Sequence, residues 1–394
     1  MLSFPKTAMN KLDVQQLLQT ARERTGLSDF GPPDFMEGLE VLVSGINNEA
    51  QIADERFDVM VETRFLRVLM NRLWFAKDLA DHPEILDEDI GSPVIIASLP
   101  RTGSTKLHRM LGAAPDFQTM KFWHTNMFAR IPGLPDGGRE RRIQETRDLE
   151  SWMYKTSPGI LTGHPPFTDE PEEDQWLMEF SFRHPFLFGM YQSVEYAQWI
   201  GQADMTPTFN YFLQQLKYLQ WQEGSRHNIP WLLKTPNHLG NEELLTRLYK
   251  KPRFIITHRD PAKCVPSVTY TAGVMRKLYS HLDSTALLGA ATLELFSHCA
   301  SVHLQWRDSK PDVEILDLGF REVTEDGIGT ARKVYDFLGM EFTPAAEKAM
   351  RDWESDNPKD KHGKGVTNAA SIGTTDEKIR ERFAPYMQRF ATYI

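Results

Sequence analysis

Residues 94–105 read Val-Ile-Ile-Ala-Ser-Leu-Pro-Arg-Thr-Gly-Ser-Thr, and residues 106–111 continue with Lys-Leu-His-Arg-Met-Leu. The apolar run at the start predicts a short buried strand, and the spacing of the later apolar residues predicts a helix. Gly103 allows the backbone to turn between them. Peptide N–H groups at a helix start, together with the hydroxyls of Ser104 and Thr105, suit phosphate or sulfate oxygens. The stretch therefore predicts an anion-binding loop.

This loop departs from the nucleotide-binding pattern Gly-x-x-x-x-Gly-Lys-[Ser/Thr]. Ser98 takes the place of the first glycine, and Ser104 stands where the lysine belongs. The cation is instead Arg101, which precedes Gly103. The missing lysine argues against a P-loop kinase or nucleotide hydrolase, although that class stays open as an alternative. An ordinary turn between a strand and a helix is the remaining interpretation.

Composition excludes several classes of protein. The chain has 394 residues and a net charge of −9, which argues against nucleic acid as the main partner. Cys264 and Cys299 are the only cysteines, and the twelve histidines form neither His-x-x-x-His nor His-Glu-x-x-His. We find no signal peptide and no uncharged apolar run long enough to span a bilayer. We therefore expect a cytoplasmic protein without a metal site.

The distribution of apolar residues predicts two parts. Residues 1–90 have helical periodicity and form an expected helical extension, whereas residues 91–394 form an expected α/β domain. Four runs within that domain are predicted as strands, at 94–97, 231–234, 253–257 and 313–317. Because helices separate them, we expect a parallel, P-loop-like sheet flanked by helices.

Two further segments of this domain bear on ligand binding. Residues 118–230 form a mainly helical insertion rich in aromatic residues, some of which are expected to line an apolar pocket. Residues 356–375 form a basic loop that carries Lys359, Lys361, His362 and Lys364, ahead of a final helix expected at 376–392. That loop is either a surface linker or a cover over an anionic ligand.

Two later motifs place cations near the predicted loop. The strand ending at residue 257 is followed by His258-Arg259-Asp260-Pro261, and Ser267 lies eight residues after Arg259, so both side chains can reach one phosphate. Lys234 ends another strand, at the edge where open parallel sheets bind ligands. Asp317 could mimic the metal-binding aspartate of nucleotide hydrolases, but a structural role is the preferred interpretation.

These elements, in this order, resemble the sulfotransferases that use 3'-phosphoadenosine-5'-phosphosulfate (PAPS). The similarity is to the bacterial branch whose phosphosulfate loop reads Pro-Arg-[Ser/Thr]-Gly-[Ser/Thr]-Thr, a loop whose arginine the tyrosylprotein sulfotransferases share. The segments that carry the resemblance are Thr25-Gly26-Leu27, Asp29-Phe30-Gly31, His82-Pro83-Glu84-Ile85, Leu99-Pro100-Arg101-Thr102-Gly103, Glu170-Pro171-Glu172-Glu173-Asp174, Lys234-Thr235-Pro236, and Arg259-Asp260-Pro261 with Ser267.

The resemblance implies a role for each matching residue. The 5'-phosphosulfate would be held by Arg101, Thr102, Gly103, Ser104 and Thr105. Arg259 and Ser267 would bind the 3'-phosphate, and Lys364 of the basic loop is a further candidate for nucleotide binding. Lys234 would neutralise the charge on the leaving phosphate. In-line transfer of a sulfuryl group needs alignment, cations and one base, and it needs no metal.

The general base stays open between two groups of residues. The bacterial branch has a Trp-Glu pair after the loop's helix, whereas this chain has Trp123-His124, and a histidine can accept a proton near neutral pH. The acidic stretch 169–174 offers the alternatives Glu170 and Glu172. Its charges also fit a solvated first turn of a helix. His164 and His238 are weaker candidates.

The sequence therefore predicts transfer of a sulfuryl group from PAPS to a hydroxyl of a small, apolar or aromatic acceptor, with 3'-phosphoadenosine-5'-phosphate as the other product. A non-catalytic nucleotide-binding protein of the same fold is a second alternative, because His124 replaces the usual glutamate. The sequence predicts neither the identity of the acceptor nor the oligomeric state.

Overall fold

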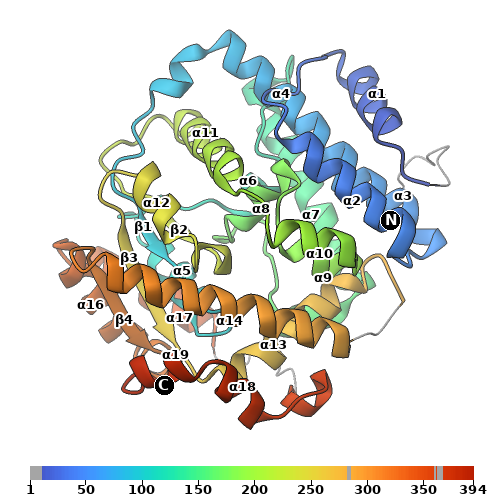
Figure 1. The fold of residues 1–394 in the computed structure, drawn as a ribbon. Coiled ribbons are helices and arrows are strands. Elements are labelled where there is room, and N and C mark those ends of the chain that lie inside the picture. Colours follow the sequence, from blue (N-terminus) through green and yellow to red (C-terminus); the bar gives the residue numbers. More distant parts are fainter. Residues whose placement is uncertain (1–10, 282–284, 359–360, 362–366) are drawn as a thin grey trace.

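The sheet sets the position of every predicted site segment. The computed structural model describes residues 11–281, 285–358, 361 and 367–394, which form one sheet of four parallel strands in the order β2-β1-β3-β4 (Figure 1). The strands are β1 (Val94–Ile96), β2 (Leu232–Lys234), β3 (Arg253–His258) and β4 (Ile315–Gly319). The expected parallel α/β sheet is thereby confirmed. Because β1 lies between β2 and β3, the loop after β1 lies between the ends of these two neighbours.

Alternate residues of the strands face two different cores, as the two-residue repeat of a strand requires. Val94 and Ile96 of β1 pack with apolar residues of the helices on one face of the sheet. Ile95 belongs to the larger core, which also contains Leu17 and Phe65 from the helices before the sheet. The expected helical extension thus shares a core with the sheet, and its boundary at residue 90 stays a prediction.

The segment before β1 is helical, as expected. It comprises α1 (Val14–Thr25), α2 (Phe35–Glu49), α3 (Asp54–Met60), a π-helix (Val61–Leu66), α4 (Arg67–Asp81) and a 3-10 helix (Pro83–Asp87). α1 begins at a regular cap, because the carboxylate of Asp13 accepts a hydrogen bond from the peptide N–H of Gln16, and it ends at Gly26.

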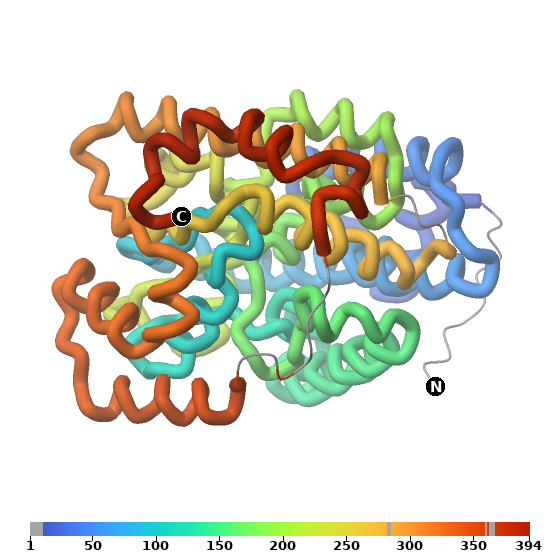
Figure 2. The backbone as a smooth tube through the Cα atoms, turned by 90° about the horizontal axis from the view of Figure 1, so that it is seen from below, coloured from blue at the N-terminus to red at the C-terminus, as the bar shows by residue number. Residues whose placement is uncertain are grey.

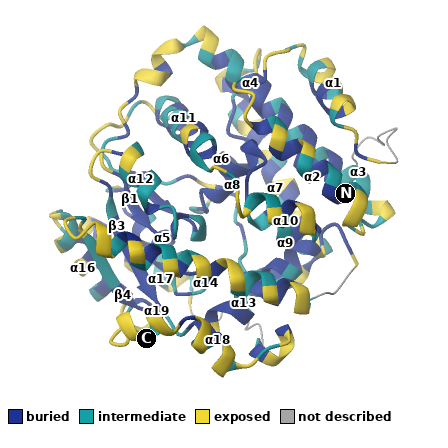
Figure 3. Cartoon of the chain, in the orientation of Figure 1, coloured by how far each residue is buried: buried dark blue, intermediate teal, exposed yellow. Residues whose placement is uncertain are grey.

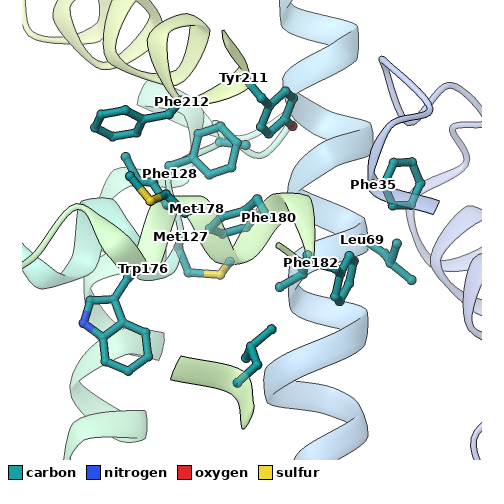
Figure 4. Packing of buried hydrophobic residues seen from close by; sticks show 14 of the residues in the cluster. Phe35, Leu69, Met127, Phe128, Trp176, Met178, Phe180, Phe182, Tyr211 and Phe212 are labelled. Atoms are coloured by element: carbon teal, nitrogen blue, oxygen red, sulfur yellow. The ribbon is translucent and has the colours of Figure 1, made fainter. Parts of the chain in front are cut away.

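The insertion between β1 and β2 is mainly helical and carries much of the aromatic core. Its helices are α6 (Phe122–Asn126), α7 (Arg139–Thr156), α8 (Gln175–Met178), α9 (Phe186–Tyr191), α10 (Val194–Ile200) and α11 (Thr206–Gln222), with 3-10 turns at Pro135–Gly138, Pro158–Thr162 and Glu179–Ser181. Figure 4 shows the rings of Phe128 and Phe180 packed together, with Phe212 and Trp176 in the same region of the core. Most of the predicted aromatic residues therefore serve the core.

The remaining helices follow the strands. They are α5 (Ser104–Gly112) after β1, a 3-10 turn (Pro236–His238) and α12 (Glu242–Leu248) after β2, and α13 (Pro261–Arg276) and α14 (Thr285–Ser309) after β3. After β4 come α15 (Phe320–Glu325), α16 (Gly327–Leu338), α17 (Pro344–Asp356), a 3-10 turn (Ala369–Ile372), α18 (Asp376–Arg382) and α19 (Ala384–Arg389). Figure 2 shows the last part of the chain, from the 3-10 turn at Ala369–Ile372 to α19, lying along α13 and α14.

Two predicted boundaries were wrong for local reasons. The single helix expected at 376–392 is two helices, because α18 ends at Arg382 and Pro385 then lies in the first turn of α19, where a proline is tolerated. The last strand begins two residues late, at Ile315. Val313 belongs instead to the turn after α14, since its N–H bonds to the carbonyl of Lys310.

α14 is the one helix in the described part of the chain that is long and apolar enough to cross a membrane, by length and composition alone. Only 28% of its most apolar window is buried, and Leu287 and Leu295 are exposed on it. Exposed residues recur along this helix in Figure 3. α14 nevertheless packs against α13 and the C-terminal helices, as part of the α/β fold.

Candidate active site

The loop between β1 and α5 has a strained and well-anchored backbone. Arg101 has a φ of 69° and Gly103 a φ of 87°, and the positive value at Arg101 is uncommon for a residue with a side chain. The buried hydroxyl of Thr102 bonds to the carbonyl of Leu99 at 2.8 Å and meets the hydroxyl of Thr257 in β3 at 2.6 Å. Thr102 thus anchors the loop to the sheet, while Ser104 begins α5.

Arg101, Arg259 and Ser267 lie together, as the motifs suggested. The Nε of Arg101 donates to the Ser267 hydroxyl at 3.0 Å, and Arg259 donates from Nη1 to the carbonyl of Arg101 at 2.8 Å. Burial and the positive charge of Arg259 lower the pKa of Arg101. Within the described residues neither guanidinium has a carboxylate in an ion pair. Two adjacent cations without acidic partners make a strong site for an anion.

Lys234, at the end of β2, connects this loop to the acidic stretch. Its ammonium group donates to the hydroxyl of Thr105 at 3.0 Å and forms a buried ion pair with the carboxylate of Glu173. Its peptide N–H donates to Asp174 at 2.8 Å, and the other carboxylate oxygen of Asp174 bonds to His238. Asp174 therefore holds both ends of the turn that follows β2.

The carboxylates of the acidic stretch have different surroundings. Glu170 accepts a hydrogen bond from the indole of Trp353, outside the pocket described below. Glu172 is buried between Arg109 and His164, at 3.2 and 2.7 Å. Burial alone would raise the pKa of Glu172, but these two neighbours lower it below its ordinary value. Of these carboxylates, only Glu173 meets Lys234 and also lines the pocket.

His124 lies away from Lys234 and Glu173. It lies in α6, where its Nδ1 accepts a hydrogen bond from the peptide N–H of Lys121, and its Nε2 is 3.4 Å from Glu223. Its side chain does not line the pocket that contains Lys234. Burial lowers the pKa of His124 more than the neighbouring carboxylate raises it, which makes it a weaker base. Its position is that of a helix cap.

A large pocket opens beside Lys234 and Glu173. It comprises about 970 Å³ of space, part of which is open to solvent. Polar groups are concentrated where Arg101, Thr105, His164, Glu173 and Lys234 meet. The other walls are mostly apolar and come from α8, α9, α13 and α14, including Trp176, Phe186, Phe188, Val268, Met275, Leu288 and Phe296. A ligand with an apolar body and one polar end fits such walls.

The basic loop lies largely outside the described residues, and so do Lys359, His362 and Lys364. Lys361 is described, and its ammonium group bonds to the carbonyl of Asp356 and to the side chain of Asn357. The assignment of Lys364 to nucleotide binding stays a prediction.

Comparison with known proteins identifies the family of this chain. The sequence model of the Sulfotransferase family matches residues 93–344, which include the loop, Lys234, Arg259 and Ser267. The chain belongs to the sulfotransferase family. No curated protein sequence matches this sulfotransferase significantly. Among solved structures, sulfotransferase STF9 from Mycobacterium avium is similar, with a TM-score of 0.85 and 24% identity over 98% of each chain.

Sulfotransferase STF1 from Mycobacterium tuberculosis H37Rv is also similar in structure. Its TM-score is 0.80 at 24% identity, over 95% of the present chain and 99% of STF1. Both likenesses extend over the helices before β1 as well as the sheet. They establish that the sulfotransferase has the same fold from end to end.

Proposed function

We propose that the protein transfers the sulfuryl group of PAPS to a hydroxyl group of an apolar or aromatic acceptor. The observation that carries the proposal is the meeting of Lys234, Glu173 and Thr105 beside Arg101, at the polar end of an otherwise apolar pocket. Cations for the departing phosphate and a carboxylate for the acceptor proton thus lie in one place. Family membership supports the sulfuryl chemistry.

The residues around the loop fit the two ends of the donor. The N-terminus of α5, with Thr105 and Arg101, suits the 5'-phosphosulfate because no side chain caps the helix start and both residues line the pocket. Arg259 and Ser267 suit the 3'-phosphate, which distinguishes PAPS from ATP. Neither Arg101 nor Arg259 pairs with a carboxylate among the described residues, which supports this assignment, since a bound phosphate would balance their charge.

Glu173 is the proposed general base. The acceptor oxygen attacks sulfur while the bond from sulfur to the bridging phosphate oxygen breaks, and the acceptor proton passes to the carboxylate of Glu173. Lys234 stabilises the negative charge that develops on the leaving phosphate. Its contact with Thr105 keeps the ammonium group beside the phosphosulfate loop. The products are a sulfate ester and 3'-phosphoadenosine-5'-phosphate.

The acceptor class follows from the pocket walls. Trp176, Phe186 and Phe188 offer flat apolar surfaces, so phenols and other ring-bearing alcohols are the preferred acceptors. A relation to the tyrosylprotein sulfotransferases beyond the shared arginine loop stays a prediction, and so does location in the cytoplasm.

The test combines binding with turnover. Isothermal titration of 3'-phosphoadenosine-5'-phosphate should give clear binding, and ATP should bind much more weakly. Labelled PAPS incubated with a panel of phenols, steroids, lipids and sugars should give sulfated products of the ring-bearing members. Tight binding of ATP with magnesium-dependent hydrolysis would instead favour a P-loop kinase or hydrolase. Nucleotide binding without any product would favour the non-catalytic alternative.

A further inference from the structure

A second, smaller cavity lies behind one wall of the acceptor pocket. Its lining comes from the π-helix, α4, α6, α7, α8 and the 3-10 turn after α8, and consists of Arg64, Arg67, Phe122, Thr125, Asn126, Leu149, Met153, Trp176 and Glu179. Trp176 also lines the acceptor pocket, so its indole belongs to both walls. The cavity has room for about one water molecule or one small ion in this conformation.

The charges around this cavity do not balance. Arg64 donates from Nη1 to both oxygens of Glu179 at 3.2 and 3.3 Å, and Arg67 donates from Nη2 to one of them at 2.7 Å. Among the described residues, Glu179 is the only carboxylate that pairs with either arginine. All three side chains are less than a tenth exposed. Two guanidinium groups and one carboxylate leave one positive charge buried without compensation, which is costly.

One buried donor group at the cavity also lacks an acceptor. The indole Nε1 of Trp176 is buried and has no hydrogen-bond partner among the described residues. Buried donors in folded proteins are normally paired, so an unpaired donor beside an excess positive charge indicates a missing acceptor with negative charge.

The backbone that carries Arg64 is itself unusual. Residues Val61–Leu66 form a π-helix between α3 and α4, and Arg64 is in it. Such segments are rare and are often found at functional sites, because the wider turn redirects side chains. Here the irregular turn places Arg64 against Trp176, with its guanidinium carbon 5.4 Å from the ring centroid.

We infer that the cavity behind Trp176 is a binding site for one small anionic group, held by Arg64, Arg67 and the Trp176 indole N–H. The group is either a free halide ion or a carboxylate at the end of the acceptor opposite its hydroxyl. The first source is independent of the proposed function. The second rests on it and requires Trp176 to turn, so that the acceptor pocket and the cavity become continuous.

The free ion is tested without any enzyme assay. Crystals of the wild-type protein soaked in sodium bromide should show an anomalous peak in the cavity. The melting temperature should be higher in chloride than in gluconate at equal ionic strength. Arg67→Met leaves one arginine against one carboxylate, so it should abolish the difference between chloride and gluconate. Arg183→Met is the control, because Arg183 is a buried arginine that pairs one-to-one with Glu37 elsewhere.

The acceptor arm uses pairs of phenols that differ only by a carboxylate on a short chain. If the acceptor supplies the anion, KM for the carboxylate-bearing member should be lower by about tenfold, and Arg67→Met should remove that preference while kcat for the neutral phenol is kept. A bromide peak supports the free-ion source, and a carboxylate preference supports the acceptor source. If the folded wild-type protein shows neither a bromide peak nor a preference for the carboxylate-bearing phenol, the inference is overturned. If it shows a bromide peak but no turnover of any acceptor, only the proposed function is overturned.

Discussion

Glu173 and Lys234 form a buried ion pair at the polar end of the pocket that Trp176 lines, and Lys234 also bonds to Thr105 in the loop between β1 and α5. This relationship joins three segments that are far apart in the sequence. It brings the proposed base and the proposed leaving-group cation into direct contact before any ligand is bound. Donor binding would draw the ammonium group toward the phosphate and leave the Glu173 carboxylate available to the acceptor.

Replacing Glu173 tests its role as base. Glu173→Gln keeps the size of the side chain but removes its basicity, so kcat should fall by about 10²- to 10⁴-fold. The affinity for 3'-phosphoadenosine-5'-phosphate, measured by titration calorimetry, should not fall, because Lys234 is retained. Glu170→Gln is the matched control, since its partner is Trp353 and it lies outside the pocket. Unchanged turnover in Glu173→Gln would exclude Glu173.

A separate variant tests His124. In His124→Ala the cap on α6 is lost, and the free energy of unfolding should fall by about 1 kcal/mol. Turnover per folded molecule should remain, since His124 does not line the acceptor pocket. Urea denaturation and steady-state kinetics on the same preparation separate the two effects. A loss of kcat of a hundredfold or more in a stably folded variant would restore the histidine as base.

Arg259 should decide the preference for a 3'-phosphate. In Arg259→Ala the affinity for 3'-phosphoadenosine-5'-phosphate should fall by about 10- to 100-fold, because a charged hydrogen-bond donor is lost. The affinity for adenosine-5'-phosphate should hardly change. Lys263→Ala is the control, since Lys263 lies four residues further along the chain, in α13, but is exposed and pairs with Asp376. Equal losses for both nucleotides would argue against a 3'-phosphate site at Arg259.

The sequence predicted the sheet and the turn from β1 into α5 because both depend on local patterns. An apolar run followed by a glycine turn specifies a strand and a helix start, whatever surrounds it. The acidic stretch is different, because five of the six residues at 169–174 are carboxylates of similar chemistry. Glu172 is enclosed by Arg109 of α5 and His164, whereas Glu173 pairs with Lys234. That distinction depends on how distant helices pack, which the sequence does not reveal.

Gly103 should be needed for both stability and donor binding. It has a φ of 87°, and a Cβ there would lie 3.3 Å from Val323. Gly103→Ala should lower the free energy of unfolding by about 1–2 kcal/mol and weaken nucleotide binding. Gly91→Ala is an informative control, since Gly91 has a φ of 66° but nothing within 4 Å of its Cβ position. Gly91→Ala should lower the free energy of unfolding but leave the affinity for the nucleotide unchanged. Equal nucleotide affinity in both variants would show that Gly103 is not needed for donor binding.

Asp317 should govern part of the stability at low pH. Its two oxygens accept hydrogen bonds from Arg307 at 2.7 and 2.8 Å, and His258 is 2.8 Å from one of them. Burial would raise the pKa of Asp317, but these partners lower it from 3.8 to about 2. Since the folded pKa is depressed, the stabilisation is present above about pH 4 and is lost as the pH falls toward 2. The linked free energy is about 2 kcal/mol.

Urea denaturation at several pH values between 5 and 2 checks this expectation. Stability of the wild-type protein should decline more steeply over that interval than stability of Asp317→Asn, which has no carboxylate to protonate at this position. Asp352→Asn is the control, because Asp352 is an exposed partner of Lys348 and should leave the decline unchanged. Parallel curves for the wild-type protein and Asp317→Asn would contradict the proposed pairing. A structural ion pair at Asp317, in the middle of β4, also accounts for this partly buried aspartate without assigning it to a metal.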